Sequence, residues 1–82
     1  MFKKIVLDVL KPLNPSILEF AEELLKIRGV DSVEITNIEI DREVENVKIV
    51  LYGRLEYEKI RRTIENFGAT IHSIDGVVAS RR

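Results

Sequence analysis

The chain has 82 residues with no cysteine, and its 13 Lys and Arg nearly balance 14 Asp and Glu. This length suffices for one small domain, and the lack of thiols excludes disulfides, CxxC redox pairs and thiolate metal sites. The net charge of -1 provides no global field that would attract nucleic acid or an anionic membrane. Because no apolar run could span a membrane and no signal peptide is present, we expect a cytoplasmic protein. Abundant isoleucine and glutamate without glutamine are typical of a thermophile.

The first third of the chain predicts a strand followed by a helix. Apolar residues alternate over residues 3–10, which indicates a half-buried strand. The pair Asn14-Pro15 supplies a helix cap and a proline for the first helical position. Gly29 supplies the left-handed residue at which helices commonly end. We therefore expect a helix over about residues 15–28.

The rest of the chain predicts three strands and a second helix. In order, these are a strand over 30–41 with a bulge near Thr36-Asn37, a hairpin connection over 41–46, a strand over 47–52, a helix over about 55–67 closed by Gly68, and a strand over 69–80 broken or turned at Asp75-Gly76. The order βαββαβ predicts a single α+β domain over residues 1–82. Its expected fold is a ferredoxin-like two-layer sandwich, with an antiparallel sheet in the order 4-1-3-2 and both helices on one face.

The predicted topology leaves one sheet face without helices. We expect this open sheet face to contain Val6, Asp8, Leu10, Lys48, Val50, Tyr52, Thr70, His72 and Ile74. The mixture is too apolar for a face that is simply left in water. We therefore expect a homo-oligomer in which this face contacts another subunit, or a face covered by the C-terminal segment VVASRR of residues 77–82.

The only histidine, His72, stands beside Ser73 in a predicted strand. Successive strand residues point to opposite faces, so the imidazole cannot reach the neighbouring hydroxyl and the two do not form a nucleophilic pair. If the first and fourth strands are antiparallel neighbours, Asp8 falls opposite His72 on the open face. Three interpretations follow: a polar pair buried in an interface, a metal or ligand site, or an exposed pair.

A second polar concentration is acidic and crowds the predicted second strand and hairpin. Its members are Glu34, Glu39, Asp41, Glu43 and Glu45. Such carboxylates suit calcium or magnesium, but the EF-hand spacing is missing, and a solvated hairpin neutralised by Arg42 and Lys48 is the alternative. Asp75 is first a turn signal, and its carboxylate could join a site. The predicted ligands of a divalent cation, calcium or another, are Asp8, Glu39, Asp41, Glu43, His72 and Asp75.

Phosphate and RNA chemistry receive little support. The chain lacks both the GxxxxGK[ST] and the GxGxxG patterns. The predicted start of the first helix, near Lys11, offers only a weak anion site. RNA-recognition domains share the predicted topology but stack bases on sheet aromatics, and Tyr52 is the only aromatic expected on the open face. We therefore expect neither nucleic acid nor a membrane as a partner.

Segments along nearly the whole chain resemble one archaeal family. They are LDVLKP (7–12), PSI (15–17), GVDSVEI (29–35), IEIDREVENVKI (38–49) and IHSIDGVVAS (71–80). Taken in order, they resemble the archaeal domain of unknown function family 211. The resemblance implies a small ferredoxin-like protein that forms higher oligomers, with metal ions, calcium in particular, as suspected ligands and no established reaction. Where that family often has a polar residue after the Lys-Pro pair, this chain has Leu13.

Three functional hypotheses follow. The preferred one is a non-enzymatic oligomeric module whose open sheet face joins subunits and whose acidic residues bind divalent cations. The second is a small-molecule-sensing regulatory domain that binds its ligand at a subunit interface, with the loop from Lys11 to Ser16 at the ligand end. An enzyme would need a further polar group converging on His72 or Asp8, and the sequence shows none.

Overall fold

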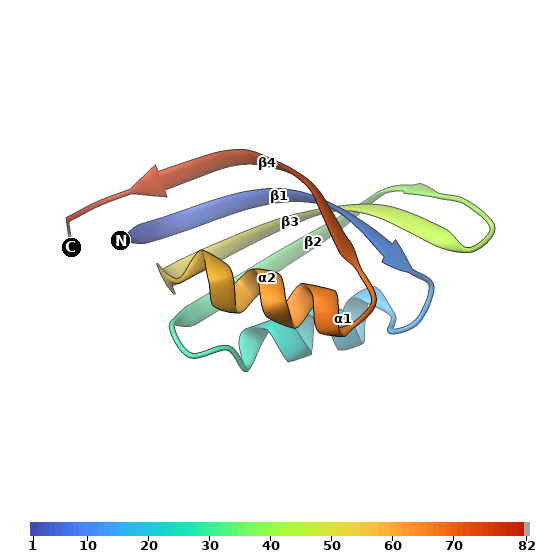
Figure 1. The fold of residues 1–82 in the computed structure, drawn as a ribbon, viewed down its shortest axis with the longest axis horizontal. Coiled ribbons are helices and arrows are strands. Elements are labelled where there is room, and N and C mark those ends of the chain that lie inside the picture. The colour runs from blue at the N-terminus through green and yellow to red at the C-terminus, as the bar shows by residue number, and fades with distance from the viewer. Residues whose placement is uncertain (82) are drawn as a thin grey trace.

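The computed structural model describes residues 1–81 and has the predicted order βαββαβ. Its elements are β1 (Phe2–Pro12), α1 (Ile17–Leu25), β2 (Val30–Ile40), β3 (Val44–Leu55), α2 (Tyr57–Asn66) and β4 (Thr70–Ala79). The antiparallel sheet has the order β2-β3-β1-β4, which is the predicted order read from the opposite edge. Both helices lie on one side of the sheet, and the β2–β3 hairpin extends beyond them (Figure 1). The arrangement is consistent with a ferredoxin-like fold.

The hydrophobic core lies between the sheet and the two helices. Ile5, Leu7 and Val9 point into it from β1, because alternate strand residues share a face. The facing helices contribute the fully buried side chains Phe20, Leu24, Ile60 and Ile64. The aromatic rings of Phe20 and Phe67 join the helices, with their centroids 5.8 Å apart. Neither helix described in residues 1–81 is long and apolar enough to cross a membrane.

The ends of the first helix differ from the prediction. The N-cap is Ser16 rather than Asn14, and the helix begins at Ile17. The Ser16 hydroxyl accepts a hydrogen bond from the Glu19 amide at 3.2 Å, while the Glu19 carboxylate accepts one from the Ser16 amide at 3.4 Å. This reciprocal capping box satisfies two amides that the first helical turn leaves unpaired. It therefore stabilises a helix that begins at Ile17 over one that begins at Pro15.

Two glycines hold the start of β2 against the end of β3. Gly29 has the positive φ of 97° expected after a helix, although α1 already ends at Leu25. Its carbonyl accepts a hydrogen bond of 2.7 Å from the Arg54 amide. A side chain on Gly53, where φ is 148°, would overlap that same carbonyl. The close backbone approach therefore requires glycine at both positions.

The hairpin is shorter than predicted, and its bulge lies next to the expected place. β3 already begins at Val44, so only residues 41–43 connect the strands, closed by a hydrogen bond of 2.8 Å from the Asp41 amide to the Val44 carbonyl. The bulge falls at Ile38, between Asn37 and Glu39, one residue beyond the predicted pair. The extra residue explains why the alternation of apolar residues along this strand shifts by one position in the sequence.

The last strand is continuous, which corrects the predicted break at Asp75-Gly76. β4 runs through both residues and pairs with β1 over most of its length. Two bulges replace the break, with His72 and Asp75 as the extra residues. The end of β4 stays beside β1, where the Ser80 amide donates to the Met1 carbonyl at 2.8 Å. Residues 77–81 therefore do not cover the open face, and Arg82 lies outside the described residues.

Candidate functional site

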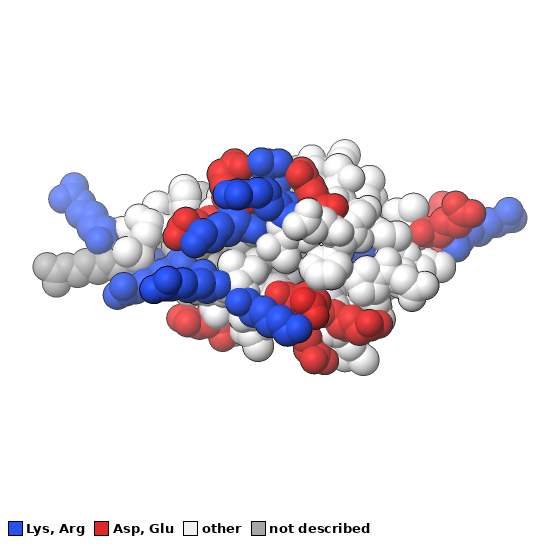
Figure 2. Space-filling model, turned by 60° about the horizontal axis from the view of Figure 1, so that its bottom comes forward, with Lys and Arg blue, Asp and Glu red and all other residues white. Residues whose placement is uncertain are grey.

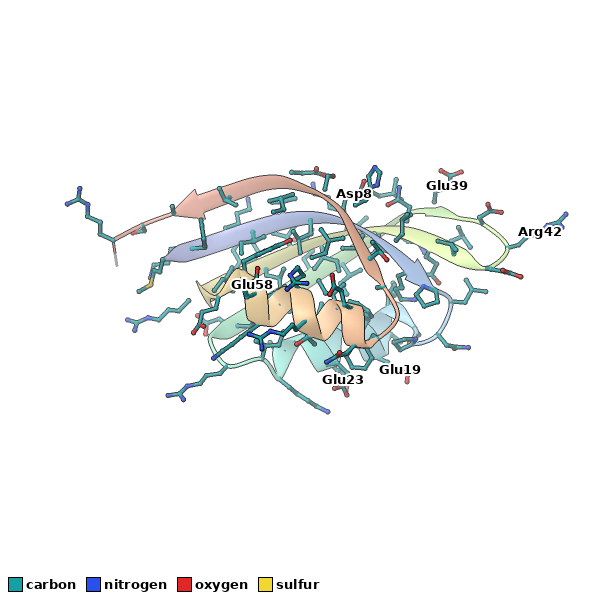
Figure 3. The ribbon with its side chains drawn as sticks, in the orientation of Figure 1. Asp8, Glu19, Glu23, Glu39, Arg42 and Glu58 are labelled. Atoms are coloured by element: carbon teal, nitrogen blue, oxygen red, sulfur yellow. The ribbon has the colours of Figure 1, made fainter. Side chains whose placement is uncertain are left out.

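The open sheet face is built from four rows of residues that lie opposite one another across the strands. From the end of the sheet at the chain termini toward the hairpin, the rows are Ser32, Tyr52, Lys4 and Val78; Glu34, Val50, Val6 and Gly76; Thr36, Lys48, Asp8 and Ser73; and Glu39, Asn46, Leu10 and Thr70. Figure 3 shows Asp8 and Glu39 on this side of the sheet, away from Glu19, Glu23 and Glu58 on the helices. The predicted open face is thus largely present.

The fourth strand supplies different residues to this face than predicted. Ser73, not His72, lies opposite Asp8, because His72 is the extra residue of a bulge. Ile74 lies opposite Leu7, so it belongs to the helix side of the sheet rather than to the open face. The predicted Asp8–His72 pair is therefore wrong in register. A one-residue slip is enough to move every later side chain to the other face.

Asp8 is the most unusual polar group on the open face. Its Oδ1 atom is buried and accepts no hydrogen bond within residues 1–81. The Ser73 hydroxyl, which belongs to the residue opposite Asp8, donates to the Asp75 carboxylate at 2.6 Å and not to Asp8. A buried carboxylate oxygen without a partner carries a desolvation cost, which a second molecule or a cation would relieve.

The acidic hairpin forms a small cavity on the same face. Glu39 and Asp41 line it with Asn46, Leu10 and Val44, and its volume is about 210 Å³. The Asn46 Oδ1 atom is buried and has no hydrogen-bond partner in the described chain. One Asp41 oxygen accepts a hydrogen bond of 2.7 Å from the Arg42 amide. Two carboxylates and one amide oxygen are the ligand types that calcium prefers.

The six predicted metal ligands do not form one centre within a single chain. No group of three or more His, Asp or Glu side chains in residues 1–81 lies close enough together to hold a metal ion. Glu39 and Asp41 share the cavity, whereas Glu43 is exposed on the hairpin and does not line it. Asn46 was not among the predicted ligands, which were carboxylates and the histidine. Strand alternation with Lys48 and Val50 indicates that Asn46 lies on the open face, but only the register between β2 and β3 places it opposite Glu39.

A second polar cluster lies inside the molecule, at the helix side of the sheet. Lys11 is fully buried, and its ammonium group donates to the Pro12 carbonyl at 2.7 Å and approaches the Glu45 carboxylate at 3.4 Å. The Asn37 amide group also reaches Glu45, at 3.5 Å. Lys11 is therefore sealed in the core, and the capping box of Ser16 occupies the start of α1. Neither supports the predicted weak anion site near Lys11.

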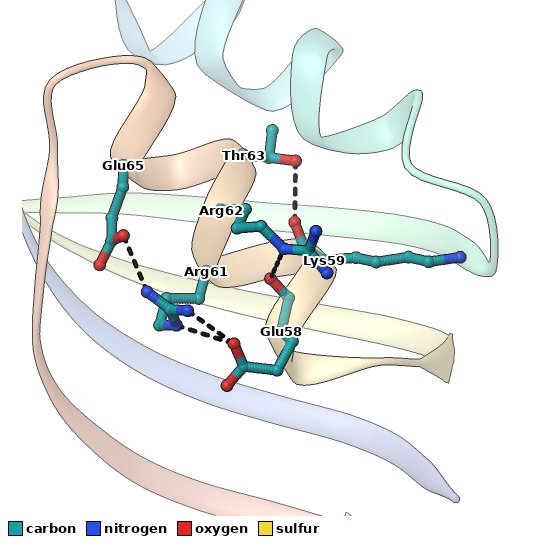
Figure 4. A network of polar contacts seen from close by, with 6 residues as sticks. All are labelled: Glu58, Lys59, Arg61, Arg62, Thr63 and Glu65. Carbon is teal, nitrogen blue, oxygen red and sulfur yellow. Dashed lines mark hydrogen bonds and ion pairs between the residues drawn. The ribbon is translucent and has the colours of Figure 1, made fainter.

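The outer surface of α2 carries a chain of ion pairs (Figure 4). Arg61 lies between Glu58, at 2.6 Å, and Glu65, at 2.9 Å. The hydrogen bond from Arg61 lowers the pKa of Glu58 below its ordinary value of 4.5. The same hydrogen bonds with Glu58 and Glu65 raise the pKa of Arg61. These are helix-stabilising pairs at spacings of three and four residues.

The fold and its uncovered sheet face define a small βαββαβ module, and the sequence comparisons place it more narrowly. The family model of domain of unknown function 211, described as "Uncharacterized ArCR", matches residues 3–82, and the chain belongs to this family. A protein of Methanocaldococcus jannaschii, itself described only as uncharacterized, is 47% identical over 81 residues, which cover 98% of this chain and 84% of that protein. The suspected family is thereby confirmed.

Proposed function

We propose that the protein is a non-enzymatic module that assembles with copies of itself through the open sheet face and binds a divalent cation at the hairpin. The observation that carries this proposal is Asp8, whose buried carboxylate oxygen has no partner within residues 1–81. Burial of this oxygen is costly in a free monomer. A hydrogen-bond donor or a cation brought by a second copy removes that cost.

The composition of the open face supports assembly. Its apolar members are Val6, Leu10, Val44, Val50, Tyr52 and Val78. The projecting hairpin adds Ile38 and Ile40, whose side chains are 58% and 66% exposed. Large apolar side chains gathered on one face and one arm are typical of surfaces that contact another protein. The strands β2 and β4 also form free sheet edges, which can pair with a second copy.

The hairpin cavity supports the cation part of the proposal. Glu39, Asp41 and Asn46 offer three oxygen-bearing side chains, and calcium takes about six to eight oxygen ligands. Water or a second copy must supply the remainder. Leu10 lines the cavity and follows Asp8 by two residues on the same face of β1. Cation binding at the hairpin and contact between subunits are therefore expected to reinforce each other.

Multi-angle light scattering tests the proposal, with the protein run in calcium and then in a chelator. We expect a defined oligomer in calcium and a smaller species, or a weaker oligomer, in the chelator. The double substitution Glu39→Gln with Asp41→Asn should abolish the response to calcium. Glu43→Gln is the matched control, because Glu43 sits on the same hairpin but outside the cavity. A monodisperse monomer under both conditions would refute self-assembly.

A further inference from the structure

A basic groove runs between the two helices, on the side of the molecule opposite the open sheet face. Its volume is about 560 Å³, and it is lined by Glu23, Lys26, Ile27, Arg28, Lys59, Arg62, Thr63, Asn66 and Phe67. Four of these residues are cationic and one is anionic, so the lining carries a formal charge of +3 in a chain of net charge -1. Figure 2, which brings the helix side forward, shows Lys and Arg side chains gathered around the middle and left of this face.

Two of the four cations form ion pairs within the described residues 1–81, and two do not. Lys26 contacts Glu23 at 2.8 Å, and Lys59 contacts Glu56 at 3.5 Å. Arg62 donates a long hydrogen bond of 3.4 Å to the Glu58 carbonyl, and its charge also helps to lower the pKa of the Glu58 carboxyl.

Arg28 makes no hydrogen bond or ion pair to any residue of the described chain 1–81. Arg28 follows α1 and Arg62 lies on α2, so the two guanidinium groups that form no ion pair stand on opposite walls of the groove. A guanidinium group matches the oxygens of a phosphate with parallel hydrogen bonds.

The groove also has an apolar base and neutral hydrogen-bonding groups. Ile27 and Phe67 are half-buried against the core and line the groove from below. The Asn66 side chain makes no hydrogen bond within residues 1–81, so its amide group is available to a ligand. Small-molecule sites typically combine an apolar surface with a few polar groups, in volumes of roughly 300 to 1,000 Å³. The groove has this combination and falls within this range.

Helix electrostatics alone account for only part of this arrangement. Lys26 and Arg28 directly follow α1, where cations are favoured by the partial negative charge at a helix C-terminus. Arg62 and Lys59 lie on the other helix, and that explanation does not apply to them.

We propose that the groove binds a small phosphate-bearing molecule of nucleotide size. Arg28 and Arg62 hold the phosphate, and Ile27 and Phe67 underlie the apolar part of the ligand. This site is separate from the open sheet face, so it does not depend on self-assembly or on calcium.

Equilibrium dialysis with inorganic phosphate, AMP and adenosine tests the proposal on the intact protein. We expect AMP to bind more tightly than inorganic phosphate, because its nucleoside covers the apolar base, and adenosine not to bind. Arg28→Ala and Arg62→Ala should each weaken AMP binding about tenfold. Hydrogen exchange should show AMP-dependent protection at residues 26–28 and 59–67. Added salt should weaken binding, because the groove is open to solvent.

The matched control is Arg42→Ala, which removes the same charge at the hairpin tip, far from the groove (Figure 3). This variant should bind AMP like the unsubstituted protein, and circular dichroism should show all three variants folded. The proposal would be overturned if Arg42→Ala weakened AMP binding as much as the groove variants do, or if the groove variants bound AMP like the unsubstituted protein. It would also be overturned if AMP did not bind at millimolar concentration. Binding of adenosine as tight as that of AMP would overturn the phosphate assignment. An RNA oligonucleotide that binds far more tightly than AMP through the same arginines would replace the small ligand with nucleic acid.

Discussion

Lys11 is the only charged side chain of residues 1–81 that is completely buried. Its ammonium group is held by the Pro12 and Leu13 carbonyls, at 2.7 and 3.4 Å, and by Glu45. The alternation of Ile5, Leu7 and Val9 along β1 leads directly to Lys11 as the next inward position. Sequence patterns alone did not extend the strand so far, because lysine is almost never fully buried without a partner. Its partner, Glu45, lies in a segment that looked like a polar hairpin.

Removal of the Lys11 charge should strongly destabilise the fold. Lys11→Met keeps most of the side-chain volume but leaves Glu45 without its cation, and we expect the free energy of unfolding to fall by about 3 kcal/mol. Glu45→Gln alone should also destabilise. The double variant should lower the free energy of unfolding by less than the sum of the two single effects, with a difference of about 1 kcal/mol or more. The reason is that each single change leaves the other group buried without its ion-pair partner. Guanidinium unfolding curves provide the measurement.

The control for this double-mutant cycle is Lys26→Met, which removes an exposed ion pair at the C-terminal end of α1. Its lysine side chain is 70% exposed, so its loss should change the free energy of unfolding far less than Lys11→Met does. Strictly additive effects of Lys11→Met and Glu45→Gln would show that the buried contact of 3.4 Å does not couple the two groups.

At the level of whole elements, the periodicity of apolar residues was sufficient to predict the type and the chain order of the helices and strands. It did not predict where each element ends or how the strands are aligned with one another. The apolar stripes of the helices and the alternation of the strands predicted all six elements, and the topology of two crossovers joined by a hairpin predicted the sheet order. The bulge at His72 has no local sequence signal, and the turn signal at Asp75-Gly76 was interpreted as a break in the strand rather than as a bulge. The start of the first helix was also wrong, because Asn14 was predicted as the cap and the structure uses Ser16. Only the Glu19 side chain distinguishes them.

The candidate site was likewise predictable in its residue types but not in its geometry. The residue types of a cation site were visible in the acidic hairpin, and Glu39 and Asp41 do share a cavity. The involvement of Asn46 and the exclusion of His72 from the Asp8 row both follow from register, which the sequence did not show. The basic groove was not predicted either. Its cations come from two helices, and no sequence motif links Arg28 with Arg62.

The ion pairs on α2 make a contribution to the stability of the fold that should depend on pH. The hydrogen bond from Arg61 lowers the pKa of Glu58 below 4.5, its ordinary value. A group whose pKa is lowered by folding stabilises the folded state above its unfolded pKa and loses that effect as the pH falls through the folded value. We therefore expect Glu58→Gln to lower the melting temperature near neutral pH, and the difference from the unsubstituted protein to shrink below about pH 4.5.

Melting curves between neutral and acidic pH provide the measurement, with Glu43→Gln as the control. Glu43 is exposed on the hairpin, and no ion pair joins it to other residues of the described chain. Its substitution should produce no comparable pH-dependent difference. A Glu58→Gln difference that stays constant from neutral pH to well below pH 4.5 would contradict a role for the carboxylate charge.

The whole molecule presents two contrasting surfaces. It is an elongated body of 42 × 22 × 17 Å, with the helices on one side and the open sheet face on the other. The helix side carries the basic groove, whereas the open face combines apolar residues with Asp8 and the acidic cavity. The described residues 1–81 form one sheet with both helices on the same side, so the other sheet face is left uncovered. Our proposal is that a second copy of the chain covers it.

Substitution of Asp8 tests assembly through the open face separately from divalent-cation binding at the hairpin. Asp8→Asn keeps the size of the side chain but removes its charge, so a donor or cation contributed by a second copy loses its anionic partner. We expect the dissociation constant of the assembly, measured by sedimentation over a range of protein concentrations, to rise about tenfold. Thr36→Val is the matched control, because Thr36 occupies the same row of the open face without a charge. Asp8→Asn that assembles as tightly as the unsubstituted protein, or more tightly, would mean that the unpartnered carboxylate is a cost of the monomer fold and not a contact between subunits.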